Sequence, residues 1–173
     1  MIHPEYRVFV DCGGNDRFLM ERYLKTLPSF DKIFVFEPNP TFYNSYKGSN
    51  LIFIPKAVWT EDRTMQMYIS KDTKQYGSSL IKERDTIFHE KPIEVECIDF
   101  SKWIKDNIKP YWKLTVKLDI EGAEYDVLWK LIKDGTIKYI KELYVEFHVI
   151  KNVKKTELIK ELISIGVNPK NWE

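Results

Sequence analysis

Short apolar runs alternate with segments of helical periodicity along the first third of the chain. Three runs, at residues 8–10, 33–36 and 51–54, have the length and the β-branched or aromatic content of buried strands. Between the first two runs, apolar residues recur at helical spacing until a proline ends the segment. Asn39 and Pro40 are typical of a helix N-cap and the first helical residue. This alternation predicts a parallel sheet with right-handed crossovers and helices on both faces.

The hydrophobic period changes to two in the middle of the chain. Met65, Met67 and Ile69 alternate with polar residues, and a second alternation follows over residues 93–97. Such a period with one polar face predicts antiparallel, half-exposed strands, which we expect to form a hairpin added at an edge of the sheet. Residues 76–79, between the two strands, are predicted to form a loop.

The α/β pattern resumes after Asp99, which can cap a helix. Strands are predicted at residues 116–120 and 143–147, and the second of these is expected to be the last parallel strand. Helical periodicity covers residues 122–134 and 158–163. No repeat or linker interrupts the chain. We therefore expect a single domain, residues 1–173, of the α/β class with a doubly wound, mostly parallel sheet.

Composition and charge narrow the class of protein. The chain has 173 residues, of which 43% are hydrophobic, and a net charge of +1, which gives no general attraction to nucleic acid or membrane. No apolar run approaches the roughly 20 residues that span a bilayer, and the polar N-terminus does not resemble a signal peptide, so we expect a cytoplasmic protein. Cys12 and Cys97 lie in strand-like contexts and are expected to be buried free thiols.

Acidic side chains follow four of the predicted parallel strands. The first strand ends at Asp11, before two glycines, and the second ends at Glu37. Three more acids and a histidine end the last two strands: Asp119, Glu121, Glu146 and His148. In a doubly wound sheet, ligands bind beyond the carboxyl ends of the strands, where the strand order switches. The pattern therefore predicts a ligand site at this edge.

The glycine turn after the first strand lets the backbone approach a ligand closely. It lacks the Gly-x-Gly-x-x-Gly fingerprint of dinucleotide sites, because residue 15 is Asn and residue 18 is Phe. Glu37, at the tip of the next strand, can accept two hydrogen bonds from a ribose diol. A nucleoside without a pyrophosphate fits S-adenosylmethionine better than NAD. The alternative is a plain strand-to-helix turn.

Four short segments of the chain match the successive motifs of a known family in their order and spacing. They are residues 10–15 (Val-Asp-Cys-Gly-Gly-Asn), 36–40 (Phe-Glu-Pro-Asn-Pro), 77–80 (Gly-Ser-Ser-Leu) and 117–124 (Lys-Leu-Asp-Ile-Glu-Gly-Ala-Glu). The series resembles the FkbM family of S-adenosylmethionine-dependent methyltransferases, and the last segment is the most specific. The resemblance implies a Rossmann-like methyltransferase sheet, S-adenosylmethionine as cofactor, and methylation of a hydroxyl oxygen on a sugar or small metabolite.

The resemblance also implies roles for individual residues. Asp11, Gly13 and Asn15 correspond to the cofactor turn, and Glu37 corresponds to the acid that binds ribose. The full set expected to contact the cofactor is Asp11, Gly13, Gly14, Asn15, Glu37, Pro38, Ala57 and Val58. Asp119 and Glu121 fall where the family presents its active-site strand end.

Three residues are candidates for catalysis, because methyl transfer needs a base only to remove the acceptor's hydroxyl proton. Asp119 is the first candidate, with a helix N-cap as its alternative role. Glu121, like Glu124, is alternatively an acid that stabilises the helix dipole. His148 is either the base or a polar residue just beyond a strand. Asp119, Glu121, Glu146 and His148 together could ligate Mg²⁺ or Mn²⁺, which favour oxygen-rich sites, but the spacing does not demand an ion and we assign no metal ligand.

Other polar residues near the predicted site have two interpretations each. Tyr76, Ser78 and Ser79 are predicted to form a loop on the acceptor side, with a surface turn as the alternative. Lys117 is charged in mid-strand and is expected to pair with a neighbouring acid. Arg17 either contacts the cofactor carboxylate or is a solvated helix residue.

Two features depart from the family pattern. Arg17 stands where the family usually has a glycine, and the chain ends soon after Gly166, where family members commonly continue through two more strands. Two other functions therefore stay open: a degenerate S-adenosylmethionine-binding module without turnover, and an RNA ribose methyltransferase, which the neutral charge balance disfavours. The expected partner is a small-molecule or carbohydrate acceptor, rather than nucleic acid or a membrane. A shortened sheet edge would also gain from a partner strand in a homodimer.

Overall fold

Six strands form the larger of two sheets, and every neighbouring pair in it is parallel. The computed structural model describes residues 5–47, 51–84, 87–151 and 153–172. The strand order is β3-β2-β1-β7-β8-β9. The strands are β1 (Arg7–Cys12), β2 (Lys32–Phe36), β3 (Ile52–Ile54), β7 (Lys113–Leu118), β8 (Ile140–Val145) and β9 (Lys170–Asn171). The predicted mixed α/β architecture with a large parallel sheet is confirmed.

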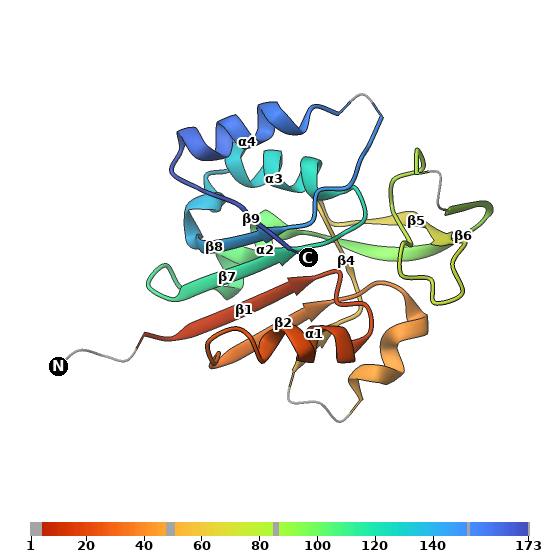
Figure 1. Ribbon diagram of the computed structural model, residues 1–173, viewed down its shortest axis with the longest axis horizontal. Helices are drawn as coiled ribbons and strands as arrows, with labels where there is room; N and C mark the ends of the chain where they lie inside the picture. The colour runs from red at the N-terminus through yellow and green to blue at the C-terminus, as the bar shows by residue number, and fades with distance from the viewer. Residues whose placement is uncertain (1–4, 48–50, 85–86, 152, 173) are drawn as a thin grey trace.

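The two faces of this sheet are covered unequally (Figure 1). On one face, α2 (Phe100–Asn107), α3 (Glu124–Lys133) and α4 (Lys155–Ser164) bury the main core against β1, β7 and β8. On the other face, α1 (Arg17–Leu24) and the 3-10 helix η1 (Pro40–Tyr46) enclose a smaller cluster around Val35. A second 3-10 turn, η2 (Thr136–Tyr139), leads from α3 into β8.

A second sheet has the order β4-β6-β5 and lies beyond the carboxyl ends of β1, β2 and β7 (Figure 1). Its strands are β4 (Ala57–Trp59), β5 (Arg63–Ser70) and β6 (Ile87–Asp99). β5 pairs antiparallel with β6, with Met65 opposite Val95, and β4 pairs parallel with β6. Met67, Val95 and Cys97 are buried on one face, as the period of two predicts. The expectation that these strands extend an edge of the larger sheet is wrong, because they form a separate sheet with β4.

Several boundaries differ from the predicted ones. The first helix spans Arg17–Leu24 and ends a turn before the proline, and the segment after Asn39 is a 3-10 helix although Asn39 caps it as expected. The prediction that residues 143–147 form the last strand is wrong, because β8 ends at Val145 and β9 pairs with it. The two residues of β9 are polar and exposed, so they carry no hydrophobic period that sequence reasoning could detect.

Other local expectations are confirmed. Asp99 caps α2 by accepting a hydrogen bond from the backbone N–H of Lys102. Cys12 and Cys97 are free and buried.

Among the described residues, none of the helices combines the length and the apolar composition that crossing a membrane requires.

A buried lysine joins the two central strands of the larger sheet. Lys117 on β7 lies opposite Asp11 on β1, and its Nζ is 2.9 Å from Asp11 Oδ1 and 3.3 Å from Asp119 Oδ2. Nζ also donates a hydrogen bond to the carbonyl oxygen of Gly13 at 2.8 Å. Burial disfavours the ammonium, but the two carboxylates outweigh burial and hold the pKa of Lys117 above its usual value. The predicted pairing of Lys117 is confirmed.

We expect Lys117→Met to lower the free energy of unfolding by about 3–5 kcal/mol, because it leaves the carboxylate of Asp11 buried without its cation. Urea denaturation at pH 7 measures the change. Lys102→Met is the matched control, since Lys102 pairs with Asp62 while both side chains are more than half exposed; its cost should be far smaller, because solvent screens an exposed pair. Equal costs for the two variants would contradict a structural role for the buried pair.

Candidate functional site

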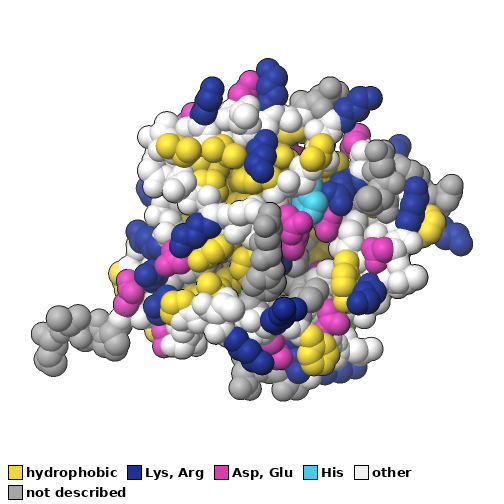
Figure 2. Space-filling model, in the orientation of Figure 1, with side chains coloured by type: hydrophobic (Ala, Val, Ile, Leu, Met, Phe, Trp, Pro, Cys, Tyr) yellow, Lys and Arg dark blue, Asp and Glu magenta, His cyan; other side chains and the backbone are white. Residues whose placement is uncertain are grey.

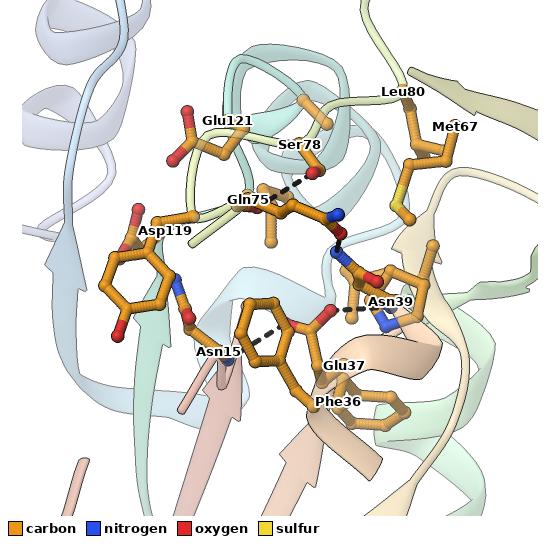
Figure 3. A pocket seen from close by; sticks show the side chains of 18 residues that line it. Asn15, Phe36, Glu37, Asn39, Met67, Gln75, Ser78, Leu80, Asp119 and Glu121 are labelled. Atoms are coloured by element: carbon orange, nitrogen blue, oxygen red, sulfur yellow. Dashed lines mark hydrogen bonds between the residues drawn. The ribbon is translucent and has the colours of Figure 1, made fainter. Parts of the chain in front are cut away.

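A pocket opens at the carboxyl ends of β1, β2 and β7, where the second sheet and the loop between β5 and β6 face them (Figure 3). It encloses about 580 Å³ of space, part of it open to solvent. Six of the eight predicted cofactor residues line it: Gly13, Asn15, Glu37, Pro38, Ala57 and Val58. Asp11 and Gly14 do not line it. They lie behind it, with Asp11 paired to Lys117 and Gly14 packed against Tyr46.

The turn after β1 requires glycine at position 13. Gly13 has φ +85°, and a Cβ there would lie 1.8 Å from the backbone oxygen of Asp119. The backbone N–H groups of Gly13 and Gly14 both donate to the carbonyl of Phe36, and that of Asn15 donates to Glu37. Because these three N–H groups are already engaged within the protein, the turn offers them to no phosphate. This supports the inference that the site does not take a pyrophosphate.

Glu37 joins the turn to the end of β2. It is buried, and its two carboxylate oxygens accept hydrogen bonds from the backbone N–H groups of Asn15 at 2.9 Å and Asn39 at 2.7 Å. Figure 3 shows its side chain at the floor of the pocket between these two residues. Burial raises the pKa of Glu37 to about 7, although both hydrogen bonds act in the opposite direction. A carboxylate held in this way keeps lone pairs for donors in the pocket.

The loop after β5 covers the pocket from two sides. Gln75 Oε1 accepts hydrogen bonds from Asn39 and Thr41, at the end of β2. On the other side, Ser79 donates to the backbone oxygen of Glu121 at 2.6 Å, and Arg84 forms an ion pair with the Glu121 carboxylate. These contacts show that the loop is more than a surface turn.

The three predicted acceptor-side residues lie in this loop but differ in their placement. Tyr76 and Ser78 line the pocket, and Ser79 does not. Ser79 is buried, and it ties the loop to the segment between β7 and α3. Its hydroxyl is therefore engaged in holding the loop.

A cluster of ionisable side chains lies at the ends of β7 and β8. The Nε2 atom of His148 is 3.2 Å from a carboxylate oxygen of Glu121, 3.6 Å from one of Glu146 and 3.9 Å from one of Asp119. Asp119 and Glu121 also line the pocket, whereas His148 does not. Figure 2 shows a histidine between acidic and basic side chains on this face of the molecule. The structure thus brings the three predicted catalytic residues together.

The structure excludes a helix N-cap as the role of Asp119, and it places Glu121 before the first turn of the helix instead of within it. Helix α3 begins at Glu124, its N-cap is Ala123, and no side chain caps it, so Asp119 is not the N-cap. Glu121 precedes the first turn of α3 and has φ +57°, an uncommon conformation for a residue with a side chain. Burial raises the pKa of Glu121 to about 7, against the opposing effects of His148 and Arg84.

Asp119, Glu146 and His148 also have the chemistry of a metal site. Within the described part of the chain, one ligand atom from each of the three lies within 4.8 Å of the others. Two carboxylates and an imidazole suit a divalent ion such as Mn²⁺. The arrangement fits such an ion without requiring one, since all three side chains have protein partners.

Two loop residues that shape the site could not be identified from the sequence. A third residue, on a helix, had two possible roles. Arg84 and Gln75 belong to no periodic pattern and reach the site only through the path of the loop. Arg17, at the start of α1, forms an ion pair with Glu21 on the same helix at 3.0 Å and does not line the pocket. Arg17 therefore makes the contacts of a residue on the helix surface.

Comparison with known proteins gives the family of the chain. The family model described as the methyltransferase FkbM domain matches residues 11–165, which include every strand end at the site. No curated protein and no solved structure matches the chain. A match over most of the chain, together with a pocket at the expected edge of a parallel sheet, shows that the chain belongs to the FkbM methyltransferase family.

Proposed function

We propose that the protein transfers a methyl group from S-adenosylmethionine to a hydroxyl oxygen of a sugar or other small metabolite. The observation that carries the proposal is the buried carboxylate of Glu37, which faces a pocket whose opposite side presents Asp119 and Glu121. One end of the pocket thus suits a ribose, and the other end suits the reacting groups. Family membership supports the methyl transfer.

The lining of the pocket suits one orientation of the cofactor. Glu37 would accept hydrogen bonds from the ribose hydroxyls, and apolar side chains that include Ala57, Val58 and Leu80 would hold the adenine. The turn of Gly13 and Asn15 would hold the methionine part. Because that turn offers no free N–H at residues 13–15 and lies beside carboxylates, it suits a cationic ligand better than a phosphate. In this orientation Asp119, which lines the same part of the pocket, would face the methyl group.

The reaction is an in-line displacement at the methyl carbon. The bond between the acceptor oxygen and the methyl group forms as the S–CH₃ bond breaks, and the hydroxyl proton passes to a base of the Asp119, Glu121 and His148 cluster. Holding the acceptor oxygen on the line of the breaking bond supplies about 7–11 kcal/mol. Removal of the proton by a placed base contributes roughly 10²–10⁴-fold.

Binding of S-adenosylhomocysteine, measured by isothermal titration calorimetry, tests the cofactor assignment. We expect Glu37→Ala to weaken binding about tenfold or more, because hydrogen bonds to a charged group are worth about 1.5–3 kcal/mol. Glu157→Ala, which removes an exposed carboxylate on α4, is the matched control and should bind like the unaltered protein. The proposal fails if neither S-adenosylmethionine nor S-adenosylhomocysteine binds.

Asp119→Asn should separate binding from turnover. The variant keeps the side-chain shape at the end of β7, so we expect its affinity for S-adenosylhomocysteine to change only a few-fold. Methyl transfer from S-adenosylmethionine, followed over a panel of hydroxyl compounds, should fall much more steeply. Unchanged turnover in the variant would remove Asp119 from the reacting groups, and binding without turnover in the unaltered protein would indicate the degenerate binding module.

Cofactor binding should depend on pH through Glu37. In the free protein, the pKa of Glu37 is about 7, so at pH 6 the carboxyl group is mostly protonated. Ribose hydroxyls that donate to it favour the carboxylate, and binding therefore releases a proton and weakens as the pH falls below 7. Calorimetry at pH 6 in two buffers of different ionisation enthalpy measures this proton. In Glu37→Gln the release should disappear, and if it persists, another group titrates.

A further inference from the structure

Gln75 lines the pocket in a backbone conformation that is uncommon for a residue with a side chain, because its φ is +60°. Contacts within the loop hold this conformation. The N–H group of Gln75 donates to the carbonyl of Asp72 at 3.2 Å, and its own carbonyl accepts from the hydroxyl of Ser78 at 2.8 Å. Residues held in such conformations cluster at ligand sites, so the Gln75 side chain is a candidate for contact with a ligand.

Asp72 organises the loop on both sides of Gln75. Its carboxylate accepts hydrogen bonds from the backbone N–H groups of Lys74 at 2.8 Å, Tyr76 at 3.4 Å and Gly77 at 3.4 Å. The residues directly before and after Gln75 are therefore bonded to the same side chain. Gln75 thus lies on a segment whose shape is set by its own residues.

The orientation of the Gln75 amide follows from its partners. Oδ1 of Asn39 accepts from the backbone N–H of Thr41 at 3.1 Å, so Asn39 presents its Nδ2 to Gln75. Because an amide nitrogen only donates, the atom of Gln75 that lies 3.4 Å from it is the oxygen, Oε1. The hydroxyl of Thr41 donates to the same oxygen at 3.0 Å. The other atom of the amide is then Nε2, which can only donate.

The N–H groups of Nε2 are left for a ligand. Nε2 forms no hydrogen bond with any residue that the structure describes, and the Gln75 side chain lies across the pocket from Glu37 (Figure 3). Both residues contact Asn39, whose backbone N–H donates to the Glu37 carboxylate at 2.7 Å and whose amide donates to Gln75. A group that only donates and a group that only accepts thus face the same part of the pocket.

A ribose hydroxyl matches this pair of groups, because its hydrogen can be donated to a carboxylate while its oxygen accepts from an amide. We propose that Gln75 is a further cofactor-binding residue, whose Nε2 donates to a ribose hydroxyl oxygen of S-adenosylmethionine. The assignment rests on the proposed function and its cofactor. Glu37 and Gln75 then recognise the ribose from opposite sides, and the loop after β5 takes part in binding the cofactor.

Calorimetric titration with S-adenosylhomocysteine at pH 8, where Glu37 is mostly ionised, tests the contact. We expect Gln75→Ala to weaken binding about threefold to tenfold, because it removes one neutral hydrogen bond. Gln66→Ala is the matched control, since Gln66 is an exposed glutamine on β5 that bonds to Glu94 and does not line the pocket; it should bind like the unaltered protein. Full affinity in Gln75→Ala would overturn the proposal.

Gln75→Glu separates hydrogen-bond donation to the ligand from anchoring of the loop. The carboxylate keeps an oxygen for Asn39 and Thr41, but it has no N–H group to donate. We therefore expect Gln75→Glu to weaken binding at least as much as Gln75→Ala. Thr41→Val removes one anchoring bond and leaves Nε2 in place, so it should change the affinity far less. Full affinity in Gln75→Glu would show that Gln75 only anchors the loop, and it would overturn the proposal.

Analogues of S-adenosylhomocysteine that lack the 2′- or the 3′-hydroxyl identify the contacted atom. Gln75→Ala and the unaltered protein should bind the analogue without the contacted hydroxyl equally, because the bond is already absent. With the other analogue, the loss in Gln75→Ala should persist. A loss of the same size for S-adenosylhomocysteine and for both analogues would place the contact on another part of the ligand and overturn the ribose assignment.

NMR of the unaltered protein decides the matter even if a variant fails to fold. The ¹⁵N signal of the Gln75 side-chain amide should shift when S-adenosylhomocysteine binds, and also with 5′-methylthioadenosine, which carries the nucleoside without the amino acid. An unshifted signal with S-adenosylhomocysteine bound would overturn the proposal. If neither S-adenosylmethionine nor S-adenosylhomocysteine binds, the proposed function and the Gln75 assignment both fail, whereas binding without an effect at Gln75 removes the assignment alone.

Discussion

The buried ammonium of Lys117 holds together the segments that form the site. It donates a hydrogen bond to the carbonyl of Gly13 in the turn after β1, and it pairs with Asp11 on β1 and with Asp119 just beyond β7. The two strands are neighbours in the sheet, so one buried cation ties the glycine turn to the end of β7. A buried ion pair is costly to break although it adds little net stability. Here it holds two functional segments in one geometry.

Three more carboxylates extend this arrangement, and each is given its task by its surroundings. Glu37 accepts hydrogen bonds from two backbone N–H groups and keeps oxygen lone pairs for donors in the pocket. Glu124 accepts hydrogen bonds from two backbone N–H groups and contacts the His148 ring nitrogen Nδ1. Glu121 is paired with Arg84 from the covering loop, in a backbone conformation that costs energy. Acids around the pocket thus hold the glycine turn, the ring of His148 and the covering loop.

Much of this could be predicted from the sequence, because parallel strands buried on both faces have continuous apolar runs. The runs located β1, β2, β3, β7 and β8, and their acidic ends indicated the edge where the pocket lies. β4 was not predicted, and β9 could not be, since its two residues are polar and exposed and carry no hydrophobic period. Arg84 and Gln75 could not be assigned either, because a loop's path depends on tertiary contacts with Glu121, Asn39 and Thr41. The two roles for Asp119 could be separated only once the start of α3 was known.

A crystal structure of the protein with S-adenosylhomocysteine would show directly how the pocket holds the cofactor. We expect ribose hydroxyls within hydrogen-bond distance of Glu37 and a sulfur whose vacant methyl position faces Asp119. The sulfur end should lie beside the Gly13 turn that Lys117 holds in place. A ligand bound in the reverse direction, or outside the pocket between β2 and β7, would contradict it.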